Sequence, residues 1–251
     1  MDTQNRQDII EGRNPVMEAL RSGRTIDKIL VQTGEKHGSV IKILKMAKDM
    51  HIAVSYAERA KLDSIATTKA HQGVIAYVAA KEYVSLKEIL STAKEKNEHP
   101  FIVICDEITD PHNLGSIIRT ANAAGAHGVV ISNHNAVGLN ATVAKTSAGA
   151  VEFTPVAKVS SIAQAIEAMK KENIWVVGAD MDGDKTIYEH DFSGGVAIVI
   201  GNEGKGISHL VKERCDFIVN IPMMGQISSL NASVAGALMI YEVVRYRNSK
   251  N

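Results

Sequence analysis

The sequence is poor in cysteine and in aromatic residues, and it has no excess charge of either sign. Its 251 residues include only two cysteines, Cys105 and Cys215, which form no CxxC pair and no Cys/His cluster, so a disulfide scaffold is excluded. Aromatic residues make up 4%, which argues against a surface built mainly for stacking bases. The 28 basic and 28 acidic side chains cancel, so no overall field draws the chain onto nucleic acid or membranes.

Long apolar runs and metal-binding motifs are also missing. The nine histidines are scattered and form no HExxH motif, so we exclude a zinc hydrolase and expect no metal. No stretch approaches the ~18 apolar residues of a membrane helix. The chain starts MDTQNRQD without an apolar signal region. We therefore expect a cytoplasmic globular protein without a membrane contact.

The remaining composition is that of an ordinary folded protein, with 45% apolar and 22% charged residues. A length of 251 residues suits one large or two small domains. Residues 83–100 are charged, short of large apolar side chains and closed by Pro100, as linkers often are. We predict a small α/β domain over residues 1–80, a linker over 81–100 and a second α/β domain over 101–251.

Hydrophobic periodicity predicts alternating helices and strands in both domains. In the first domain we expect helices over residues 14–23 and 39–50 and strands over 26–32, 52–57 and 73–79. In the second we expect strands over 101–107, 128–132, 153–159, 174–180, 196–201 and 216–223, and helices over 114–125, 141–149, 162–172 and 230–246. Continuous Val/Ile runs between helices indicate a mainly parallel sheet covered on both faces. Ligands bind such sheets beyond the carboxyl ends of the strands.

The first loop at such a strand end follows FIVICDE and leads into a helix. Asp110, Pro111 and Asn113 form a turn, with Asn113 a good helix N-cap. Arg119 lies within the first two turns, away from the apolar stripe. A solvated arginine and an ordinary cap would explain this loop equally well.

The second loop reads GNEGKGIS over residues 201–208, and its three glycines allow a ligand to approach the backbone closely. A phosphate loop would need glycine at Val199 and Ser or Thr at Gly206, and a dinucleotide fingerprint would need glycine at His209. Both motifs are therefore absent. Glu203 lies among the glycines where a helix is expected to begin, and a first-turn carboxylate favoured by the helix dipole is its ordinary explanation.

The third loop reads MGQISSLNASVAGALMIYEVVR. Ser228, Ser229 and Asn231 crowd the start of the last helix, which has an apolar stripe of Val234, Leu238, Tyr241 and Val244. A doubled N-cap and a tightly packed helix at a subunit contact would explain this segment. Because all three loops follow strands of one sheet, we expect them to share a ligand site.

Three segments carry a family resemblance. DPHNLGSIIRTANAAGAHGVV, IVIGNEGKGIS and IPMMGQISSLNASVAGALMIYE resemble, in this order, the signature motifs of the SpoU or TrmH branch of the knotted SPOUT methyltransferases. The front segments IIEGRNPVMEALRSG and HQGVIAYV are similar to the amino-terminal domain of the RlmB type. That type methylates the ribose 2′-hydroxyl of a guanosine in large-subunit (23S) ribosomal RNA. The resemblance spans nearly the whole chain.

The resemblance implies a fold and a cofactor. It implies an L30e-like RNA-binding domain at the front, a trefoil knot at the carboxyl end, which folds otherwise avoid, and a homodimer with its catalytic sites near the subunit contact. S-adenosylmethionine would be held in the knot mainly by backbone atoms. The implied cofactor-binding residues are Gly201, Ile221, Leu230 and Met223, with Ser229 and Asn231 close by.

The resemblance also implies a catalytic set: Arg119, Asn113, Glu203, Ser229 and Asn231. An arginine pKa above ~12 opposes a role as base. We expect Arg119 to orient the hydroxyl and to bind an RNA phosphate, a task that suits a guanidinium. Glu203 would hold Arg119 or the substrate, and Asn113 would position both.

RNA recognition would fall to the front domain, through Arg13, Arg21 and Arg24, with Arg13 in the EGRNPV signature as the first candidate. A solvated surface explains these arginines about equally well. His71 and Gln72 belong to the second front signature but suggest no role.

Three other functions are compatible with parts of the sequence. A transfer RNA ribose methyltransferase shares the knotted domain, although a separate front domain favours the ribosomal target, as free RNA or in a ribosome assembly intermediate. A catalytically silent RNA-binding protein would need a broken motif, and the residues at the motif positions are intact. An NAD-binding enzyme lacks its glycine fingerprint.

Overall fold

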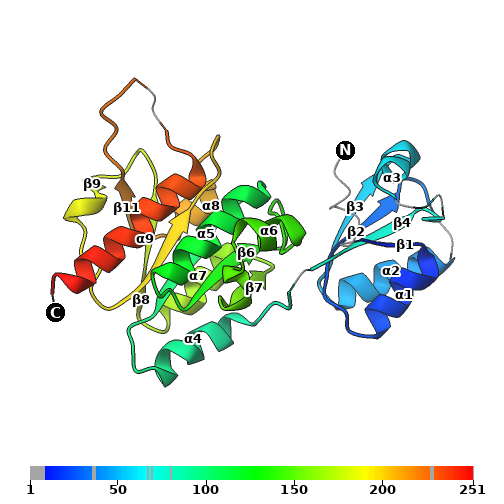
Figure 1. Ribbon diagram of the computed structural model, residues 1–251, viewed down its shortest axis with the longest axis horizontal. Helices are drawn as coiled ribbons and strands as arrows, with labels where there is room; N and C mark the ends of the chain where they lie inside the picture. Colours follow the sequence, from blue (N-terminus) through cyan, green and yellow to red (C-terminus); the bar gives the residue numbers. More distant parts are fainter. Residues whose placement is uncertain are drawn as a thin grey trace. The chain divides into compact units, whose positions relative to one another are not determined.

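The computed structural model describes residues 9–35, 38–66, 68, 70–79, 81–226 and 229–250. The chain divides into two compact units. The second begins at Tyr83, and the short segment Gly138–Thr142 groups with the first unit. Each unit has its own sheet and its own hydrophobic core (Figure 1). The small amino-terminal α/β domain expected from the sequence is therefore present.

The first unit is a four-stranded mixed sheet in the order β1-β4-β2-β3. Strand β4 is antiparallel to both β1 and β2, whereas β3 is parallel to β2. Its elements are β1 (Ile9–Glu11), α1 (Arg13–Arg21), β2 (Ile26–Gln32), α2 (Gly38–Asp49), β3 (Ala53–Ala57), α3 (Arg59–Ile65) and β4 (Val74–Val78).

Alternation along β2 gives this sheet two buried faces. Ile29 and Val31 pack with residues of α1 and α2, whereas Leu30 packs with Leu62 of α3 on the opposite side. Successive side chains of a strand point to opposite faces, so helices must cover both. The two helices and three strands predicted for this unit are present, and β1 and α3 are additional.

The second unit is a seven-stranded sheet in the order β7-β6-β5-β10-β8-β11-β9, and each pair of neighbouring strands is parallel. The expected parallel sheet is thus confirmed. Its strands are β5 (Phe101–Cys105), β6 (Gly128–Ser132), β7 (Val156–Val159), β8 (Ile174–Ala179), β9 (Lys185–Thr186), β10 (Gly195–Ile200) and β11 (Phe217–Asn220). Its helices are α4 (Leu86–Glu95), α5 (Pro111–Ala123), α6 (Ala141–Thr146), η2 (Ala150–Glu152), α7 (Ile162–Lys170), η3 (Ile187–Glu189), α8 (His209–Lys212) and α9 (Ala232–Asn248).

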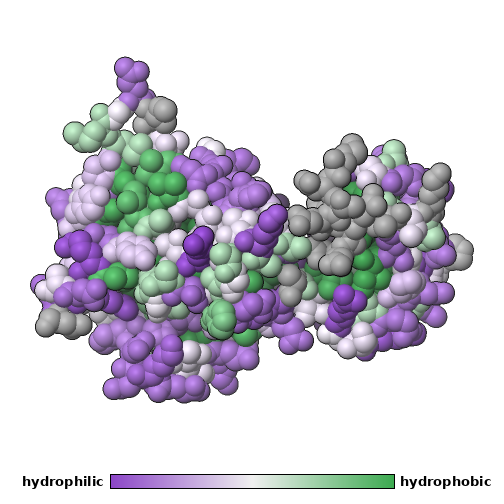
Figure 2. All heavy atoms as spheres, viewed as in Figure 1, coloured by the Kyte–Doolittle hydropathy of each residue, from purple (hydrophilic) through white to green (hydrophobic). Residues whose placement is uncertain are grey.

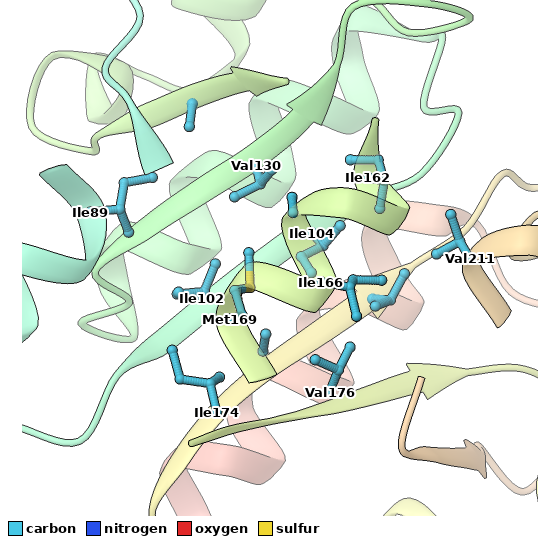
Figure 3. Close-up of a cluster of buried hydrophobic side chains, with 14 of the residues drawn as sticks. Ile89, Ile102, Ile104, Val130, Ile162, Ile166, Met169, Ile174, Val176 and Val211 are labelled. Carbon is cyan, nitrogen blue, oxygen red and sulfur yellow. The ribbon is translucent and has the colours of Figure 1, made fainter. Parts of the chain in front are cut away.

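The core of this unit lies on both faces of the central strands, since every residue of β5 and β10 is buried. Figure 3 shows Ile102 and Ile104 of β5 close to Met169 of α7 on one face. On the other face α9 packs directly on β10, because a Cβ added at Gly236 would lie 2.7 Å from the Cδ1 atom of Ile200. Burial on both faces explains why these strands are continuous apolar runs.

The segment expected as a linker over residues 81–100 contains helix α4 (Leu86–Glu95) of the second unit. Ser85 caps α4, accepting a hydrogen bond from the Glu88 backbone N–H while the Glu88 carboxylate accepts one from the Ser85 backbone N–H. Ile89 and Ala93 are fully buried, and Ile89 belongs to the main core. An amphipathic helix with a narrow apolar stripe has the charged composition of a linker, which explains the difference.

The parallel arrangement brings the carboxyl ends of β5, β8, β10 and β11 to one edge of the sheet. The loops that follow these strands therefore meet there, as the sequence predicts. Within the described part of the chain, no helix has both the length and the apolar character needed to cross a membrane.

Candidate active site

A cavity of about 720 Å³ lies at this edge of the sheet. Its walls come from the segment after β8, from the glycine-rich loop after β10 and from the segment between β11 and α9. The described residues that line it are Glu107, Ala179, Asp180, Met181, Asp182, Ile200, Gly201, Asn202, Glu203, Gly204, Lys205, Gly206, Ile207, Ser208, His209, Lys212, Ile221, Met223, Ser229, Leu230, Ala232 and Ala235. The second and third sequence loops thus share one site, as expected.

The glycine-rich loop folds back on itself. Asn202 and Gly206 exchange backbone hydrogen bonds of 2.9 and 2.8 Å, and the Asn202 amide donates to the carbonyl oxygen of Glu107. A Cβ at Gly201 would lie 2.2 Å from the backbone of Gly206, so only glycine fits there. Glu203 lies at the exposed tip of this loop, six residues before α8 begins at His209. The expected placement of Glu203 in a helix first turn is therefore wrong.

The carboxylate of Glu203 joins the three sequence motifs. Its Oε1 atom accepts a hydrogen bond of 2.8 Å from the side-chain amide of Asn113 and another from the amide of Asn231. The Asn231 amide also donates to Asn113 Oδ1, 3.0 Å away. Asn113 is only 5% exposed, so this closed network is held rigidly beside the cavity. No hydrogen bond occupies Glu203 Oε2 among the described residues.

Helix caps explain how two of these side chains are placed. Asp110, not Asn113, caps α5, because its carboxylate accepts a hydrogen bond from the His112 backbone N–H and Pro111 occupies the first helical position. Asn113 is thereby free to bond Glu203. Asn231 caps α9, with Oδ1 accepting from the backbone of Ser233 and Val234 while its amide faces Glu203. Of the expected serines at this helix start, Ser228 lies outside the described residues.

Arg119 is the one expected catalytic residue outside this arrangement. Its side chain is exposed, it does not line the cavity, and no hydrogen bond or ion pair joins it to the described residues. Arg119 follows Asn113 by six positions, which places the two side chains about 120° apart around the helix. Within one chain α5 therefore directs Asn113 toward Glu203 and Arg119 elsewhere.

All four expected cofactor-binding residues, Gly201, Ile221, Met223 and Leu230, line the cavity, as does Ser229. The apolar wall formed by Ile200, Ile207, Ile221 and Leu230 suits a nucleobase. Glu107 and Glu203 also line the cavity, and their carboxylates suit the cationic sulfonium of S-adenosylmethionine. The lining thus fits the cofactor that the resemblance implies.

The lining also contains a charged group that no sequence motif marks. Lys212 of α8 lies 3.0 Å from Asp180 Oδ1 and 3.0 Å from Asp182 Oδ2. Partial burial lowers the pKa of Lys212, but the hydrogen bonds and charges of the two carboxylates outweigh it and raise that pKa. Asp180 directly follows strand β8, so the strand-end rule that singled out the other loops also pointed here.

In the first unit, Arg13 connects the two front signatures. Its guanidinium donates to Glu35 Oε2 at 3.1 Å and to the carbonyl oxygen of Gln72 at 2.8 Å, and its side chain is 19% exposed. His71 is buried, with Nε2 near Asp63 and Nδ1 accepting from the Gly73 backbone N–H. These contacts give the HQG signature a structural role.

The other two expected RNA-binding arginines are exposed. Arg21 pairs with Glu18 one helical turn away, at 2.6 Å, whereas the Arg24 side chain makes no hydrogen bond or ion pair with the described residues. Throughout the described ranges, no three His, Cys, Asp or Glu side chains gather in a way that could hold a metal ion.

Comparisons with known proteins identify the family of this chain. Residues 100–241 match the model of the SpoU rRNA Methylase family, and residues 9–84 match the model for RNA 2′-O ribose methyltransferase substrate binding. A Bacillus subtilis protein described as a "Putative TrmH family tRNA/rRNA methyltransferase" is 48% identical over 241 residues, covering 96% of each chain. A Staphylococcus saprophyticus protein of the same description is 45% identical over 240 residues, again covering 96% of each.

A solved structure is similar as well. The SpoU methyltransferase AviRb from Streptomyces viridochromogenes, in complex with its cofactor AdoMet, is 28% identical and has a TM-score of 0.61. The match covers 96% of this chain and 90% of AviRb. These matches cover both units and all three site loops, and they show that the chain belongs to the SpoU/TrmH family of S-adenosylmethionine-dependent RNA 2′-O-ribose methyltransferases.

Proposed function

We propose that the protein methylates the ribose 2′-hydroxyl of a guanosine in large-subunit (23S) ribosomal RNA, and that it acts in the cytoplasm as a homodimer. The observation that carries the proposal is the Asn113–Glu203–Asn231 network beside the cofactor cavity, in a chain with a separate substrate-binding unit. A catalytically silent RNA-binding protein would not need this intact network. A transfer RNA target is the second candidate, since similar chains are described as tRNA/rRNA methyltransferases.

S-adenosylmethionine supplies an activated methyl group, so the chain must orient the ribose hydroxyl and manage one proton. Glu203 is held by two amides at Oε1, which leaves Oε2 to accept the hydrogen bond of the 2′-hydroxyl. Asn113 and Asn231 act as positioning residues for that carboxylate. Ser229 lines the cavity nearby and contacts the ribose or the cofactor.

Arg119 acts as a cation in this proposal, since its guanidinium suits an RNA phosphate. It binds that phosphate and orients the hydroxyl. Since α5 turns Arg119 away from its own cavity, we propose that Arg119 serves the site of a second copy. Catalysis then requires the dimer.

The dimer contact we propose is the exposed face of α9. Val234, Leu238 and Tyr241 lie at helical spacing and are 47%, 38% and 50% exposed. In Figure 2 hydrophobic residues gather on the face of the second unit where α9 runs in Figure 1. A second copy would bury this stripe next to α5, which packs beside α9.

Two further family features belong to the proposal. We infer a trefoil knot at the carboxyl end. In support, the segment between β11 and α9 lines the cavity of loop 201–208 through Ile221, Met223, Ser229 and Leu230, and α9 then packs against α5. We infer an L30e-like first unit in which Arg24 and Arg21 contact RNA while Arg13 holds the fold.

The substrate is tested by offering unmodified large-subunit ribosomal RNA, its assembly intermediates and transfer RNA as separate methyl acceptors. The proposal predicts turnover on the ribosomal substrates alone. Turnover on transfer RNA alone would assign the second candidate function.

A further inference from the structure

The cavity has a second charged group besides the Asn113–Glu203–Asn231 network, formed by Asp180, Asp182 and Lys212. Asp180 follows the last residue of β8, and its side chain is only 11% exposed. Lys212 binds Asp180 and also the 74% exposed Asp182. The proposed function gives none of these three residues a role.

The two carboxylate oxygens of Asp180 have different surroundings. Oδ1 lies 3.0 Å from Lys212 Nζ and accepts a hydrogen bond of 3.3 Å from the Asp182 backbone N–H. Oδ2 has no hydrogen-bond partner among the described residues. It faces Gly206, where an added Cβ would come within 3.0 Å of it. Glycine at 206 has φ +69° and leaves the space in front of Oδ2 open to a ligand.

We propose that Asp180 Oδ2 accepts a hydrogen bond from a ribose hydroxyl of S-adenosylmethionine, with Lys212 holding the carboxylate in place. The inference rests on the cofactor assignment and is independent of the RNA substrate. A nearly buried carboxylate with an unused acceptor requires a donor. In parallel sheets an acidic side chain at the end of a neighbouring strand recognises a nucleotide ribose in the same way.

The charge of Lys212 decides which part of the cofactor Asp180 binds. The cationic donor on the cofactor is the ammonium of its methionine part, and the neutral donors are the ribose hydroxyls and the adenine amino group, which the deoxy analogues distinguish. Lys212 already neutralises Asp180 and would repel a second cation at this short range. A neutral hydroxyl meets no such repulsion and still receives a charge-assisted hydrogen bond.

The two carboxylates then divide the cavity between them. Glu203 is bonded to Asn113 and Asn231, where the methyl acceptor must enter. Asp180 lies against Gly206 at the other end of the same loop. The proposal therefore gives the two carboxylates different tasks: Glu203 would meet the methyl acceptor, and Asp180 would bind the cofactor ribose.

The test is calorimetric binding of S-adenosylhomocysteine, which carries no transferable methyl, and of its 2′-deoxy and 3′-deoxy analogues. Asp180→Ala is compared with wild type and with Asp182→Ala, a matched control that also removes one partner of Lys212. We expect Asp180→Ala to weaken S-adenosylhomocysteine about 10- to 100-fold, as for a lost hydrogen bond to a charged group. Asp182→Ala should change the affinity less than about threefold, as for an exposed ion pair.

The analogues form a double-mutant cycle with the protein variants. Removal of the recognised hydroxyl should weaken binding to wild type about 10- to 100-fold and leave the affinity of Asp180→Ala almost unchanged. 5′-Methylthioadenosine, which lacks the amino acid, should lose affinity for Asp180→Ala as strongly as S-adenosylhomocysteine does.

Three results would overturn the inference. Unchanged affinity of folded Asp180→Ala would remove the carboxylate from the site. An effect confined to S-adenosylhomocysteine, without loss for 5′-methylthioadenosine, would assign Asp180 to the ammonium. Failure of wild type to bind S-adenosylhomocysteine would instead contradict the cofactor assignment itself, and the binding of RNA would still be measurable separately.

Discussion

The carboxylate of Glu203 accepts a hydrogen bond from the side-chain amide of Asn113, 2.8 Å away, although the two residues are 90 positions apart. Asn231 completes the network from the cap of a third element. A single acceptor atom thus ties together the loops after β5, β10 and β11. Each asparagine donates to the carboxylate, so each should affect catalysis through Glu203 rather than through direct contact with RNA.

Asn231→Asp separates capping from catalysis. Aspartate caps a helix as well as asparagine does, so the free energy of unfolding should change by less than about 1 kcal/mol. The new side chain cannot donate to Glu203 and places a like charge beside it, so kcat should fall about 10- to 100-fold. Thermal unfolding and single-turnover methyl transfer measure the two effects.

Asn231→Ala is the control for Asn231→Asp, because it loses both the helix cap and the hydrogen-bond donor to Glu203. It should lose about 1 kcal/mol of stability in addition to activity. If Asn231→Asp kept wild-type turnover, the network would be structural only.

Arg119→Ala and Glu203→Ala should each abolish methyl transfer as homodimers. Arg119→Ala should bind S-adenosylhomocysteine normally, because Arg119 does not line the cavity. If Arg119 serves the partner's site, mixing the two variants places both substitutions in one site of each mixed dimer and leaves the other intact. Free exchange should then restore roughly a quarter of wild-type activity, since half the dimers are mixed.

The same mixture also tests the alternative arrangement. Were Arg119 to act within its own chain, every site would carry one substitution and the mixture would stay inactive. Size-exclusion chromatography of labelled subunits verifies that mixed dimers form.

Arg13 and Arg24 should behave differently when changed to alanine. Arg13→Ala removes the contacts to Glu35 and Gln72 and should destabilise the first unit by about 1 to 3 kcal/mol. Arg24→Ala should leave unfolding unchanged, weaken RNA binding and lower the salt dependence of log K by about 1, as for one lost phosphate contact. Denaturant unfolding and RNA titrations at several salt concentrations distinguish the two roles. Stable Arg13→Ala with weak RNA binding would reverse the assignment.

Stability should fall as the pH drops below about 6.5. Burial lowers the pKa of His127 and of His190, and for His127 it outweighs the nearby Glu98 carboxylate. His127 Nδ1 accepts a hydrogen bond from the Phe101 backbone N–H. Protonation of Nδ1 would place two N–H donors against each other and break this bond. The unfolded chain therefore binds more protons than the folded one in this window, and the free energy of unfolding rises with pH until it levels off above 6.5.

The measurement is urea unfolding of wild type and of His127→Gln between pH 5 and pH 8. The variant should show a shallower slope below pH 6.5. An equal slope in both proteins would remove His127 from the explanation.

The strands of the parallel sheet could be predicted from the sequence, because continuous Val/Ile runs are typical of strands that helices cover on both faces. The Asn113–Glu203–Asn231 network could not be derived, since a hydrogen bond over 90 positions leaves no local pattern. The family resemblance implies the three residues of this network but not the hydrogen bonds between them. The cap of α5 was misplaced by three residues because Asp110 and Asn113 cap helices equally well and only the position of Pro111 distinguishes them.

Other differences come from side-chain direction. Composition cannot separate the amphipathic helix α4 from a linker, since both are rich in charge. Nor does spacing alone reveal that Arg13 is engaged by Glu35 while Arg24 is exposed. Asp180 follows a strand end, as the strand-end rule requires, but no glycine or family motif marks the Asp180–Lys212 pair in the sequence.

The position of the transferred methyl group tests the central claim most directly. Unmodified large-subunit ribosomal RNA is incubated with the protein and labelled S-adenosylmethionine, digested to nucleosides and analysed by mass spectrometry, with Glu203→Ala as the inactive control. The account predicts one labelled 2′-O-methylguanosine per RNA, absent from the control. Label on a base, or label that Glu203→Ala incorporates equally well, would contradict it.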